Sequence, residues 1–382
     1  MNGSLARIPV SEPRLAEDDI AAATDALRSG WISSSGRYIE EFETRWASYC
    51  GREHGIAVSS GTTALELAIE ALDLHPGDEV IIPTFTIVSC VLAVLRAGAT
   101  PVLVDADPRT WCLDVDQAAA CVTSRTRAIM PVHIYGHPVD MDPLLALAEA
   151  RGLAIVEDAA EAHGAEYLSR RGPVPEWRPA GSFGASSTFS FYANKLIATG
   201  EGGMILTDDA ATAGRLRSAR NLAFVPERRF LHRTLGHNYR LTNVQAALGV
   251  TQVARMPELL VRRRWLGAAY EERLRGVDCL ELQATQEWAR HSHWMFGIVV
   301  CDESPLDAVE LAERLARRGI ETRPFFLGMH EQPALRARGL FAAAKHPVAE
   351  RLARRGLYLP SGVGLTEIQL ERVCDAVRAE LR

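Results

Sequence analysis

Several features that define other protein classes are missing from this sequence of 382 residues. Its seven cysteines are an odd number and include no C-x-x-C pair, a pattern typical of reduced thiols in a cytosol rather than of a disulfide framework. No apolar run reaches the length that spans a membrane, and residues 1–19 lack the basic and then apolar layout of a signal peptide. We therefore expect a soluble, cytoplasmic protein without a membrane partner.

The charge pattern and the absent motifs argue against further classes. The formal net charge is −6 and no dense basic stripe is present, which argues against a nucleic-acid partner. Neither an H-E-x-x-H motif nor a cysteine pair supports a metal site, so we expect no metal ion. No G-x-G-x-x-G follows the first expected strand, which counts against a nicotinamide-dependent oxidoreductase.

The composition that is present, 47% hydrophobic and 24% charged, is that of a globular protein with a large core. Because the length exceeds one core, we predict a large domain at residues 1–255 and a smaller α+β domain at residues 256–382. In the large domain, strands alternate with helices, which predicts an α/β fold with a mostly parallel sheet between helices. The expected strands of this alternating region are His54–Ser59, Glu79–Pro83, Pro101–Val104, Ala128–Val132 and Leu153–Val156.

Two later segments have a different character. Residues 221–237 are basic and rich in loop-forming residues, and we expect a long, structure-poor loop there. Residues 243–274 have the pattern of a long helix, with a break expected at Pro257.

An anion cradle is indicated where the first strand of the alternating region meets its helix. Gly61 and Thr62, flanked by Ser60 and Thr63, place free backbone N–H groups, hydroxyls and the positive end of a helix at one point. Phosphate is the usual ligand of such a cradle. Capping of the helix alone is the alternative interpretation.

Lys195 lies in a turn-rich stretch between two expected short strands, Ser187–Tyr192 and Gly203–Thr207. Its neighbours are apolar or small, and glycines nearby allow the backbone to approach a bound group closely. A desolvated lysine loses its proton more easily and can act as the amine nucleophile of Schiff-base chemistry with a carbonyl compound or pyridoxal phosphate. A surface lysine in a loop is the alternative.

Acidic side chains follow the strand that ends at Val156. Asp158, with the small Ala160 two residues later, suits a carboxylate that keeps a pyridine nitrogen protonated next to a flat ring. Glu157 is better explained by capping or solvation, and metal ligation is the remaining alternative for the cluster.

Together these marks resemble the fold-type-I pyridoxal-phosphate enzymes, whose fold is like that of aspartate aminotransferase. The closer resemblance is to the nucleotide-sugar aminotransferases of the DegT/DnrJ/EryC1/StrS family. The matching stretches cover nearly the whole chain and include S-S-G-T-T-A-L-E-L-A (59–68), P-T-F-T-I-V-S (83–89), P-V-H-I-Y-G (131–136), V-E-D-A-A-E-A-H-G-A (156–165), G-S-F-G (181–184), T-F-S-F-Y-A-N-K (188–195), T-G-E-G-G-M (199–204) and G-H-N-Y-R-L-T-N-V-Q-A-A-L-G (236–249).

The resemblance implies a role for each matching residue. Lys195 would form the Schiff base with pyridoxal 5′-phosphate and shuttle the proton, Asp158 would pair with the pyridine nitrogen, and Glu161 would lie near the ring hydroxyl. The phosphate would be held by Gly61, Thr62, Ser190 and, from the neighbouring subunit, Asn238, which implies a homodimer with shared active sites.

One position departs from the family pattern. Relatives often stack an aromatic residue on the cofactor ring where this chain has Ile87, so stacking here must be aliphatic or come from elsewhere. A histidine in place of the lysine marks the family's dehydratases, and Lys195 argues against that branch.

Three stretches are similar to the GDP-perosamine synthases within the family: G-W-I-S-S-S-G (30–36), S-H-W-M-F (292–296) and E-T-R-P-F-F (321–326). This similarity implies transfer of an amino group from glutamate to carbon 4 of GDP-4-keto-6-deoxymannose. A GDP-sugar 3-aminotransferase, a dTDP- or UDP-4-keto-sugar aminotransferase and a non-catalytic sugar-nucleotide-binding regulator are the alternatives. The expected substrate-binding residues are Trp31, Ser33, Thr84, Tyr192, Arg240, Arg323 and His330.

Two arginines are candidates for binding anionic groups of the substrates. Guanidinium groups bind diphosphate and carboxylate groups well, which favours Arg240 and Arg323 as ligands of the nucleotide diphosphate or the donor carboxylate. A surface ion pair is the alternative for each.

Overall fold

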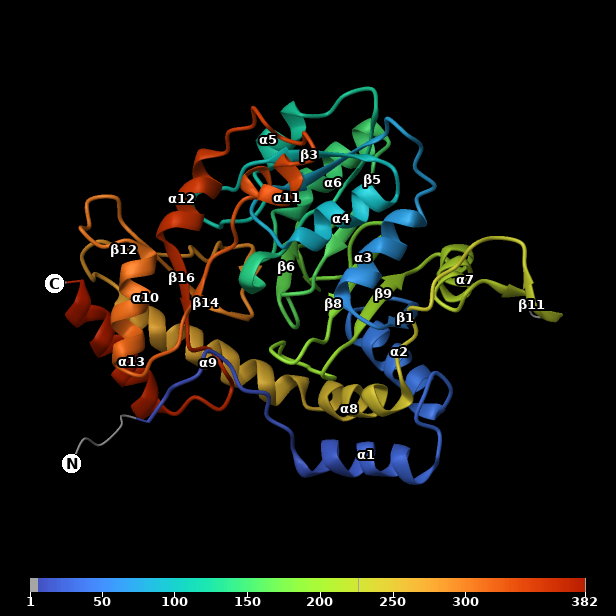
Figure 1. Cartoon of the computed structure of the whole chain (residues 1–382), viewed down its shortest axis with the longest axis horizontal. Helices are drawn as coiled ribbons and strands as arrows, with labels where there is room; N and C mark the ends of the chain where they lie inside the picture. Colours follow the sequence, from blue (N-terminus) through green and yellow to red (C-terminus); the bar gives the residue numbers. More distant parts are fainter. Residues whose placement is uncertain (1–5, 226, 382) are drawn as a thin grey trace.

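A seven-stranded sheet forms the centre of the computed structural model, which describes residues 6–225 and 227–381 (Figure 1). Among its described strands, in the order β1-β9-β8-β5-β4-β2-β3, β9 alone runs opposite to the others. The expected α/β fold with a mostly parallel sheet is therefore confirmed. The strands are β1 (His54–Val58), β2 (Glu79–Pro83), β3 (Thr100–Val104), β4 (Thr126–Ile129), β5 (Ala154–Asp158), β8 (Ser186–Ser190) and β9 (Gly203–Thr207).

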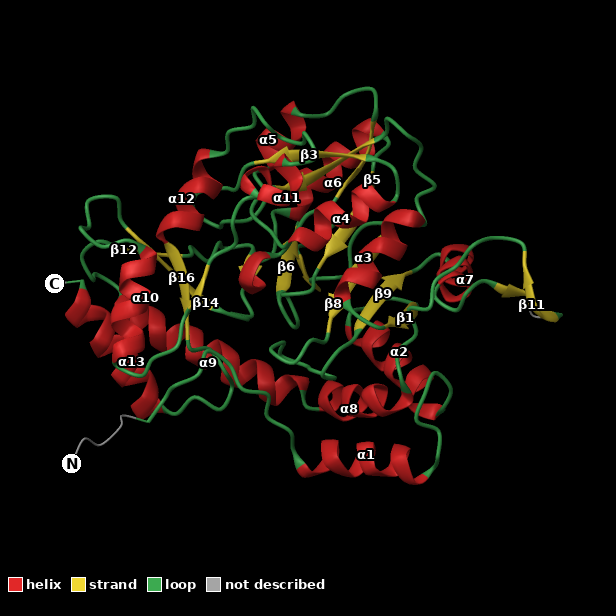
Figure 2. Cartoon of the chain, viewed as in Figure 1, coloured by secondary structure: helices red, strands yellow, loops and turns green. Residues whose placement is uncertain are grey.

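Helices bury both faces of this sheet (Figure 2). Successive side chains of a strand point to opposite faces, so Ile56 and Val58 of β1 enter one apolar core and Ala57 enters the other. The first core contains residues of α3 and α4, and the second contains residues of α2 and α8. The helices of this part are α1 (Glu17–Arg28), α2 (Arg37–Tyr49), α3 (Gly61–Glu70), α4 (Val88–Arg96), α5 (Val115–Ala120), α6 (Met141–Arg151), α7 (Ala210–Ala219) and α8 (Asn243–Ala254), with a 3₁₀ turn at Ile134–Gly136.

Strand β9 returns beside β8 and brings Lys195 with it. Parallel neighbours need a crossover connection, usually a helix, but residues 191–202 form only turns, so β9 pairs antiparallel to β8. On its other side β9 pairs with β1 up to Gly203, opposite Val58. The lysine turn therefore lies next to the start of α3.

The C-terminal part has a second sheet, antiparallel throughout, in the order β12-β14-β16-β15. Leu266, Leu311 and Val373 from three helices fill its core. Its elements are β12 (Leu280–Leu282), β14 (Phe296–Val300), β15 (Arg323–Pro324), β16 (Gly356–Leu359), α9 (Met256–Leu274), α10 (Ala308–Arg317), α11 (Pro333–Arg336), α12 (Pro347–Arg355) and α13 (Glu367–Glu380), with a 3₁₀ turn at Met329–Glu331. A three-stranded sheet, β13 (Ala289–Arg290), β6 (Glu166–Ser169) and β7 (Glu176–Pro179), joins the two parts.

The N-terminal segment crosses to this C-terminal part. Ile8 pairs with Ile320 and packs in the core around Leu311. The division at residues 255 and 256 coincides with the junction between α8 and α9. The two domains, 1–255 and 256–382, stay a prediction, and the segment around Ile8 would belong with the second.

Two segments differ from the sequence-based expectations. Within residues 221–237, expected as a loop, β10 (Phe224–Val225) and β11 (Arg228–His232) form a hairpin that projects from the body in Figure 1. Leu222 and Ala223 take positive φ angles of 61° and 49° at its base, a turn that composition does not signal. The helix break lies at Arg255, because a proline fits the first turn of a helix and Pro257 lies in the first turn of α9, which begins at Met256.

None of the described helices combines the length and the apolar character that a membrane span requires.

Candidate active site

A cavity of about 330 Å³ opens where several strands of the main sheet end at their carboxyl termini. Nine residues expected at the site from the sequence line it, although their individual roles stay predictions. They are Gly61, Thr62, Ile87, Asp158, Ala160, Glu161, Ser190, Tyr192 and Lys195. The other lining residues are Ser60, Leu65, Thr86, Ser89, Val132, Asn194, Glu201, Trp294, Phe326 and Tyr358.

The start of α3 forms one end of the cavity. Ser60 caps the helix by accepting a hydrogen bond from the Thr63 backbone N–H at 3.2 Å. A Cβ at Gly61 would lie 2.8 Å from the Ser190 Cβ, so glycine allows β8 to approach the helix start. The Thr62 hydroxyl lies in the cavity wall and shares a hydrogen bond of 2.8 Å with Ser89. Backbone N–H groups and hydroxyls thus meet at the positive end of a helix dipole.

Lys195 lines the cavity with a side chain that is 10% exposed. Its Nζ lies 3.9 Å from Glu161 Oε1 and 3.5 Å from the centre of the Trp294 ring. Burial lowers the pKa of Lys195, and the carboxylates of Glu161 and Asp158 oppose this shift. The amine is therefore easier to deprotonate than an exposed lysine, as amine nucleophiles require.

Asp158 and Glu161 form the acidic side of the cavity. Asp158, at the end of β5, is 2% exposed and accepts hydrogen bonds from the Ala160 N–H at 3.1 Å and the Cys90 thiol at 3.3 Å. Burial raises the pKa of Asp158, while the Ala160 N–H, the Cys90 thiol and Lys195 act in the opposite direction. Burial also raises the pKa of Glu161 to about 7, against the pull of Lys195.

Three aromatic residues of the C-terminal part close the cavity: Trp294, Phe326 and Tyr358. Trp294 donates its indole N–H to the Asn194 carbonyl at 2.9 Å, so it fixes the turn that carries Lys195. Trp294 and Phe326 occur in stretches noted for their subgroup similarity, but nothing in the sequence placed them beside the lysine.

This set of groups fits pyridoxal phosphate. A phosphate-binding helix start, a buried lysine amine with lowered pKa and a buried carboxylate line one cavity of a size suited to a small ligand. When bound, pyridoxal phosphate supplies an electron sink for carbanion chemistry next to its imine carbon. Lys195 would hold and later move a proton, Asp158 would face the pyridine nitrogen, and Thr62 with Ser190 would bind the phosphate. Among residues 6–225 and 227–381, no group of three or more ligating side chains could hold a metal ion.

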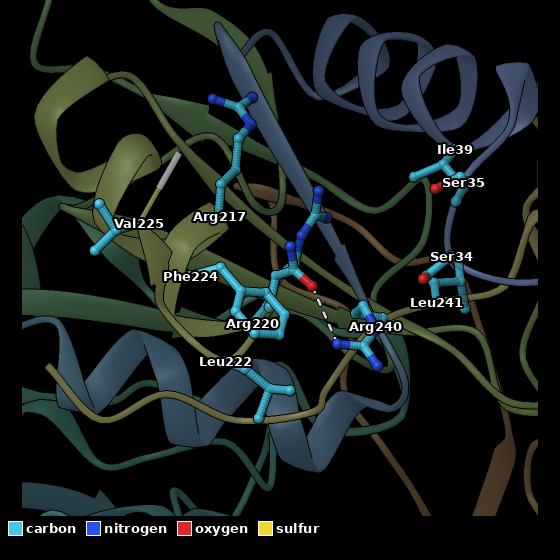
Figure 3. Close-up of a pocket in the computed structure, with 11 residues that line it drawn as sticks. Ser34, Ser35, Ile39, Arg217, Arg220, Leu222, Phe224, Val225, Arg240 and Leu241 are labelled. Atoms are coloured by element: carbon cyan, nitrogen blue, oxygen red, sulfur yellow. Dashed lines mark hydrogen bonds between the residues drawn. The ribbon is translucent and has the colours of Figure 1, made fainter. Parts of the chain in front are cut away.

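A second pocket, of about 540 Å³, lies beside the base of the β10–β11 hairpin (Figure 3). Arg217, Arg220 and Arg240 line it, together with Ser34 and Ser35. Arg240 donates to Asn221 Oδ1 at 3.0 Å, as the dashed line in Figure 3 shows. Arg220 binds the Glu43 carboxylate and the Ala57 carbonyl, a structural pairing.

Thr84 and His330, predicted as substrate ligands, do not line the cavity. Both are fully buried, and Thr84 Oγ1 lies 2.8 Å from His330 Nδ1, while His330 Nε2 lies 3.2 Å from Glu350 Oε1. Their polar atoms are thus satisfied by each other and by Glu350. These side chains join β2 to the C-terminal part, and their role as substrate ligands stays a prediction.

The remaining predicted ligands also lie outside the lysine cavity. Asn238 is exposed and pairs with Asn221, and Arg240 lines the second pocket. Trp31 is 61% exposed, and the backbone of Ser33 accepts a hydrogen bond from Asn243 N–H at 2.6 Å. Arg323 forms an ion pair with Glu321 at 2.5 Å and is half exposed. A single chain therefore does not bring these residues to Lys195.

Comparison with known proteins shows the family of this chain. The model of the DegT/DnrJ/EryC1/StrS aminotransferase family matches residues 13–378. The chain is 41% identical to a GDP-perosamine synthase of Caulobacter vibrioides, over 98% of each protein, and 37% identical to one of Escherichia coli O157:H7, over 97% of each. It is 38% identical to a dTDP-3-amino-3,4,6-trideoxy-alpha-D-glucose transaminase of Streptomyces venezuelae, over 97% of this chain and 96% of that protein.

Solved structures give the same result. S. venezuelae DesV superimposes with a TM-score of 0.89 at 36% identity, over 99% of both chains. The PLP form of Spr1654, a sugar aminotransferase from Streptococcus pneumoniae, superimposes with a TM-score of 0.90 at 26% identity, over 98% of this chain and all of that one. The expected enzyme class and cofactor are thereby confirmed at the level of the family. The chain belongs to the DegT/DnrJ/EryC1/StrS aminotransferase family.

Proposed function

We propose that this enzyme transfers an amino group from glutamate to carbon 4 of GDP-4-keto-6-deoxymannose, a reaction of the perosamine type. The observation that carries the proposal is the 41% identity to a GDP-perosamine synthase over 98% of both chains. The three stretches at residues 30–36, 292–296 and 321–326 support the same subgroup.

One cavity with a single titratable amine suits a two-step transfer. The donor would leave its amino group in the cavity and depart as 2-oxoglutarate before the sugar enters. Lys195 is the group placed to move protons in both steps, because burial keeps its pKa low and Glu161 lies 3.9 Å away. The aromatic side chains of Trp294, Phe326 and Tyr358 would exclude water from the reacting atoms.

A second candidate is an amino transfer to carbon 3, or to a dTDP sugar. The 38% identity to the S. venezuelae dTDP-sugar transaminase is close to the 41% found for the perosamine enzyme. The overall sequence identities to the enzymes for these two acceptors therefore differ by little.

The active enzyme would be a homodimer with shared sites. Asn238 and Arg240 lie outside the lysine cavity of their own chain, so a partner's cavity is where they would contact ligand. Leu27, Trp31 and Ile32 are 57%, 61% and 53% exposed at the end of α1, which supports a contact surface there. In this arrangement the second pocket supplies guanidinium groups for the diphosphate. The cytoplasmic location stays a prediction.

The test is a product assay with the purified enzyme, pyridoxal phosphate and glutamate. GDP-4-keto-6-deoxymannose and its dTDP and UDP counterparts would be supplied in turn, with mass spectrometry for the keto-to-amine change and NMR for the carbon. We expect a 4-amino product from the GDP sugar. An amine at carbon 3, or on another nucleotide, would replace the proposed acceptor by the second candidate, and no amine on any sugar would favour the non-catalytic regulator.

A further inference from the structure

We propose that Ser89 and Cys90, adjacent residues in the first turn of α4, are positioning residues for the two polar ends of the cofactor. Ser89 would orient the Thr62 hydroxyl toward the phosphate, and Cys90 would hold the Asp158 carboxylate toward the pyridine nitrogen. The inference rests on the proposed function for its ligand. In this proposal, one helix turn positions the groups at both ends of the cofactor site.

Ser89 acts on the phosphate end. Its side chain is 8% exposed, lies in the cavity wall and shares a hydrogen bond of 2.8 Å with Thr62 Oγ1. A threonine hydroxyl has one proton and two lone pairs, so a bond donated by Ser89 leaves the Thr62 proton free for a phosphate oxygen. Without Ser89, the Thr62 hydroxyl can rotate away from the phosphate.

Cys90 acts on the pyridine end. Its thiol lies 3.3 Å from Asp158 Oδ2 and 3.3 Å from Thr86 Oγ1, fully buried. Burial and the nearby Asp158 carboxylate raise the pKa of Cys90 well above its ordinary value, so the sulfur keeps its proton and is the donor. Asp158 Oδ1 accepts the Ala160 N–H at 3.1 Å, so both carboxylate oxygens are held and the plane of the carboxylate is fixed.

The two residues reach opposite ends because successive side chains of a helix point about 100° apart. Ser89 points to the first turn of α3, and Cys90 points to the end of β5. The capping residue of this helix is Ile87, whose side chain also lines the cavity. Of residues 87–90, Ile87 and Ser89 therefore line the cavity and Cys90 contacts the lining residue Asp158.

The experiment measures binding of pyridoxamine 5′-phosphate and of pyridoxamine, which lacks the phosphate, by the change in protein fluorescence. Neither probe has an aldehyde, so neither can bond to Lys195. We expect Ser89→Ala to weaken binding of the phosphorylated probe about three- to tenfold, the effect of one hydrogen bond, and to leave pyridoxamine within about twofold. Cys90→Ala should weaken both probes by a similar factor, and Ser89→Thr and Cys90→Ser should restore most of the loss.

Double-mutant cycles separate positioning from a general structural effect. Ser89→Ala should have no further effect in a Thr62→Val background, and Cys90→Ala none in an Asp158→Asn background. Cys112→Ala is the matched control, because that thiol is also buried but donates to the His137 carbonyl, away from the cavity. It should change thermal stability alone.

The outcomes separate this inference from the proposed function. If the wild type binds the phosphorylated probe and transaminates, but the Ser89 and Cys90 effects are absent or add to those of Thr62 and Asp158, the positioning role is wrong and the function stands. If the wild type does not bind pyridoxamine 5′-phosphate, both fail together.

Discussion

At the scale of a single residue, two opposing effects set the proton affinity of Lys195. Burial lowers its pKa, and the Glu161 and Asp158 carboxylates raise it. Replacing Glu161 by glutamine removes the carboxylate at 3.9 Å and leaves the burial, so the pKa of Lys195 should fall further. A lower pKa means a more reactive amine near neutral pH.

Labelling of the cofactor-free protein tests this prediction. The chain contains two lysines, Lys195 and the exposed Lys345, so mass spectrometry after brief acetylation separates both amines in one sample. The pH midpoint of Lys195 labelling should lie below the ordinary lysine value of about 10.4, and lower again in Glu161→Gln. Lys345 should label alike in both proteins. An unchanged Lys195 midpoint in the variant would show that the carboxylate does not act on the amine.

Glu161 should also make the stability of the cofactor-free protein depend on pH. Burial raises its pKa to about 7 in the folded protein, while an unfolded glutamate titrates near about 4.3. Between these values the folded state retains a proton that the unfolded state has lost. The free energy of unfolding should therefore fall as pH rises through this window, by at most about 1.4 kcal/mol per pH unit from this group.

Urea denaturation at pH 5 and pH 8 measures this effect. Glu161→Gln has no proton to lose, so its stability should decrease less between the two pH values than that of the wild type. Titrating groups other than Lys195 are common to both proteins and cancel in the comparison, and the labelling experiment measures the change in Lys195 separately. Equal pH slopes in the two proteins would count against a raised Glu161 pKa.

At the scale of elements, the joint between β9 and the start of α3 depends on Gly203. A Cβ at this position would lie 2.2 Å from the Ser60 carbonyl oxygen and 2.9 Å from the Gly61 nitrogen, both backbone atoms. Backbone cannot move aside as a flexible side chain can. Gly203→Ala should push β9 away from β1, destabilise the fold by at least about 2 kcal/mol and weaken phosphate binding at the helix start.

Gly214 provides the matched control. It lies inside α7, and a Cβ there would meet nothing within 4 Å. Gly214→Ala should stabilise the protein by about 0.5–1 kcal/mol, the usual effect of replacing a helical glycine. Thermal unfolding and pyridoxamine 5′-phosphate binding would be measured for both variants and compared with the wild type. A Gly203→Ala protein as stable as the wild type would show that β9 does not need to lie this close to the backbone of Ser60 and Gly61.

The sequence predicts the elements well where local pattern determines them. β2 and β9 begin and end at the expected residues, because each is a short apolar run bounded by loop-forming residues. The hairpin at 224–232 cannot be predicted from the pattern, because β10 has only two residues, β11 is basic and the turn before them depends on positive φ angles at Leu222 and Ala223. The periodicity of hydrophobic residues does not predict such turns.

The site residues likewise divide into those that local pattern predicts and those that only the packing of distant segments brings together. Lys195 and Asp158 could be found because Asp158 ends β5 and Lys195 follows β8, at the edge of the sheet where ligands bind. Trp294 could not be placed next to Lys195, because the two are joined only when the C-terminal part packs on the sheet. Thr84 and His330, predicted from the sequence as substrate ligands, are paired with each other by the fold, and their role stays a prediction.

At the scale of the whole molecule, shared active sites can be tested by mixing two inactive variants. Lys195→Ala removes the reactive amine of one chain's cavity, and Arg240→Ala removes a guanidinium from the second pocket. Each homodimer should lose nearly all turnover. In a mixed dimer with two-fold symmetry of sites, one site receives both altered residues and the other receives an intact Lys195 and an intact Arg240.

Refolding the two variants together should therefore restore activity to about a quarter of the wild type, since half of the random dimers are mixed and each has one intact site. Light scattering would confirm the dimer. A mixture of Lys195→Ala with Asp158→Ala is the control: both residues line the cavity of the same chain, so no intact site can form and activity should stay absent. If Lys195→Ala and Arg240→Ala also stay inactive when mixed, Arg240 serves its own chain, and the second pocket must reach Lys195 by a movement within one subunit.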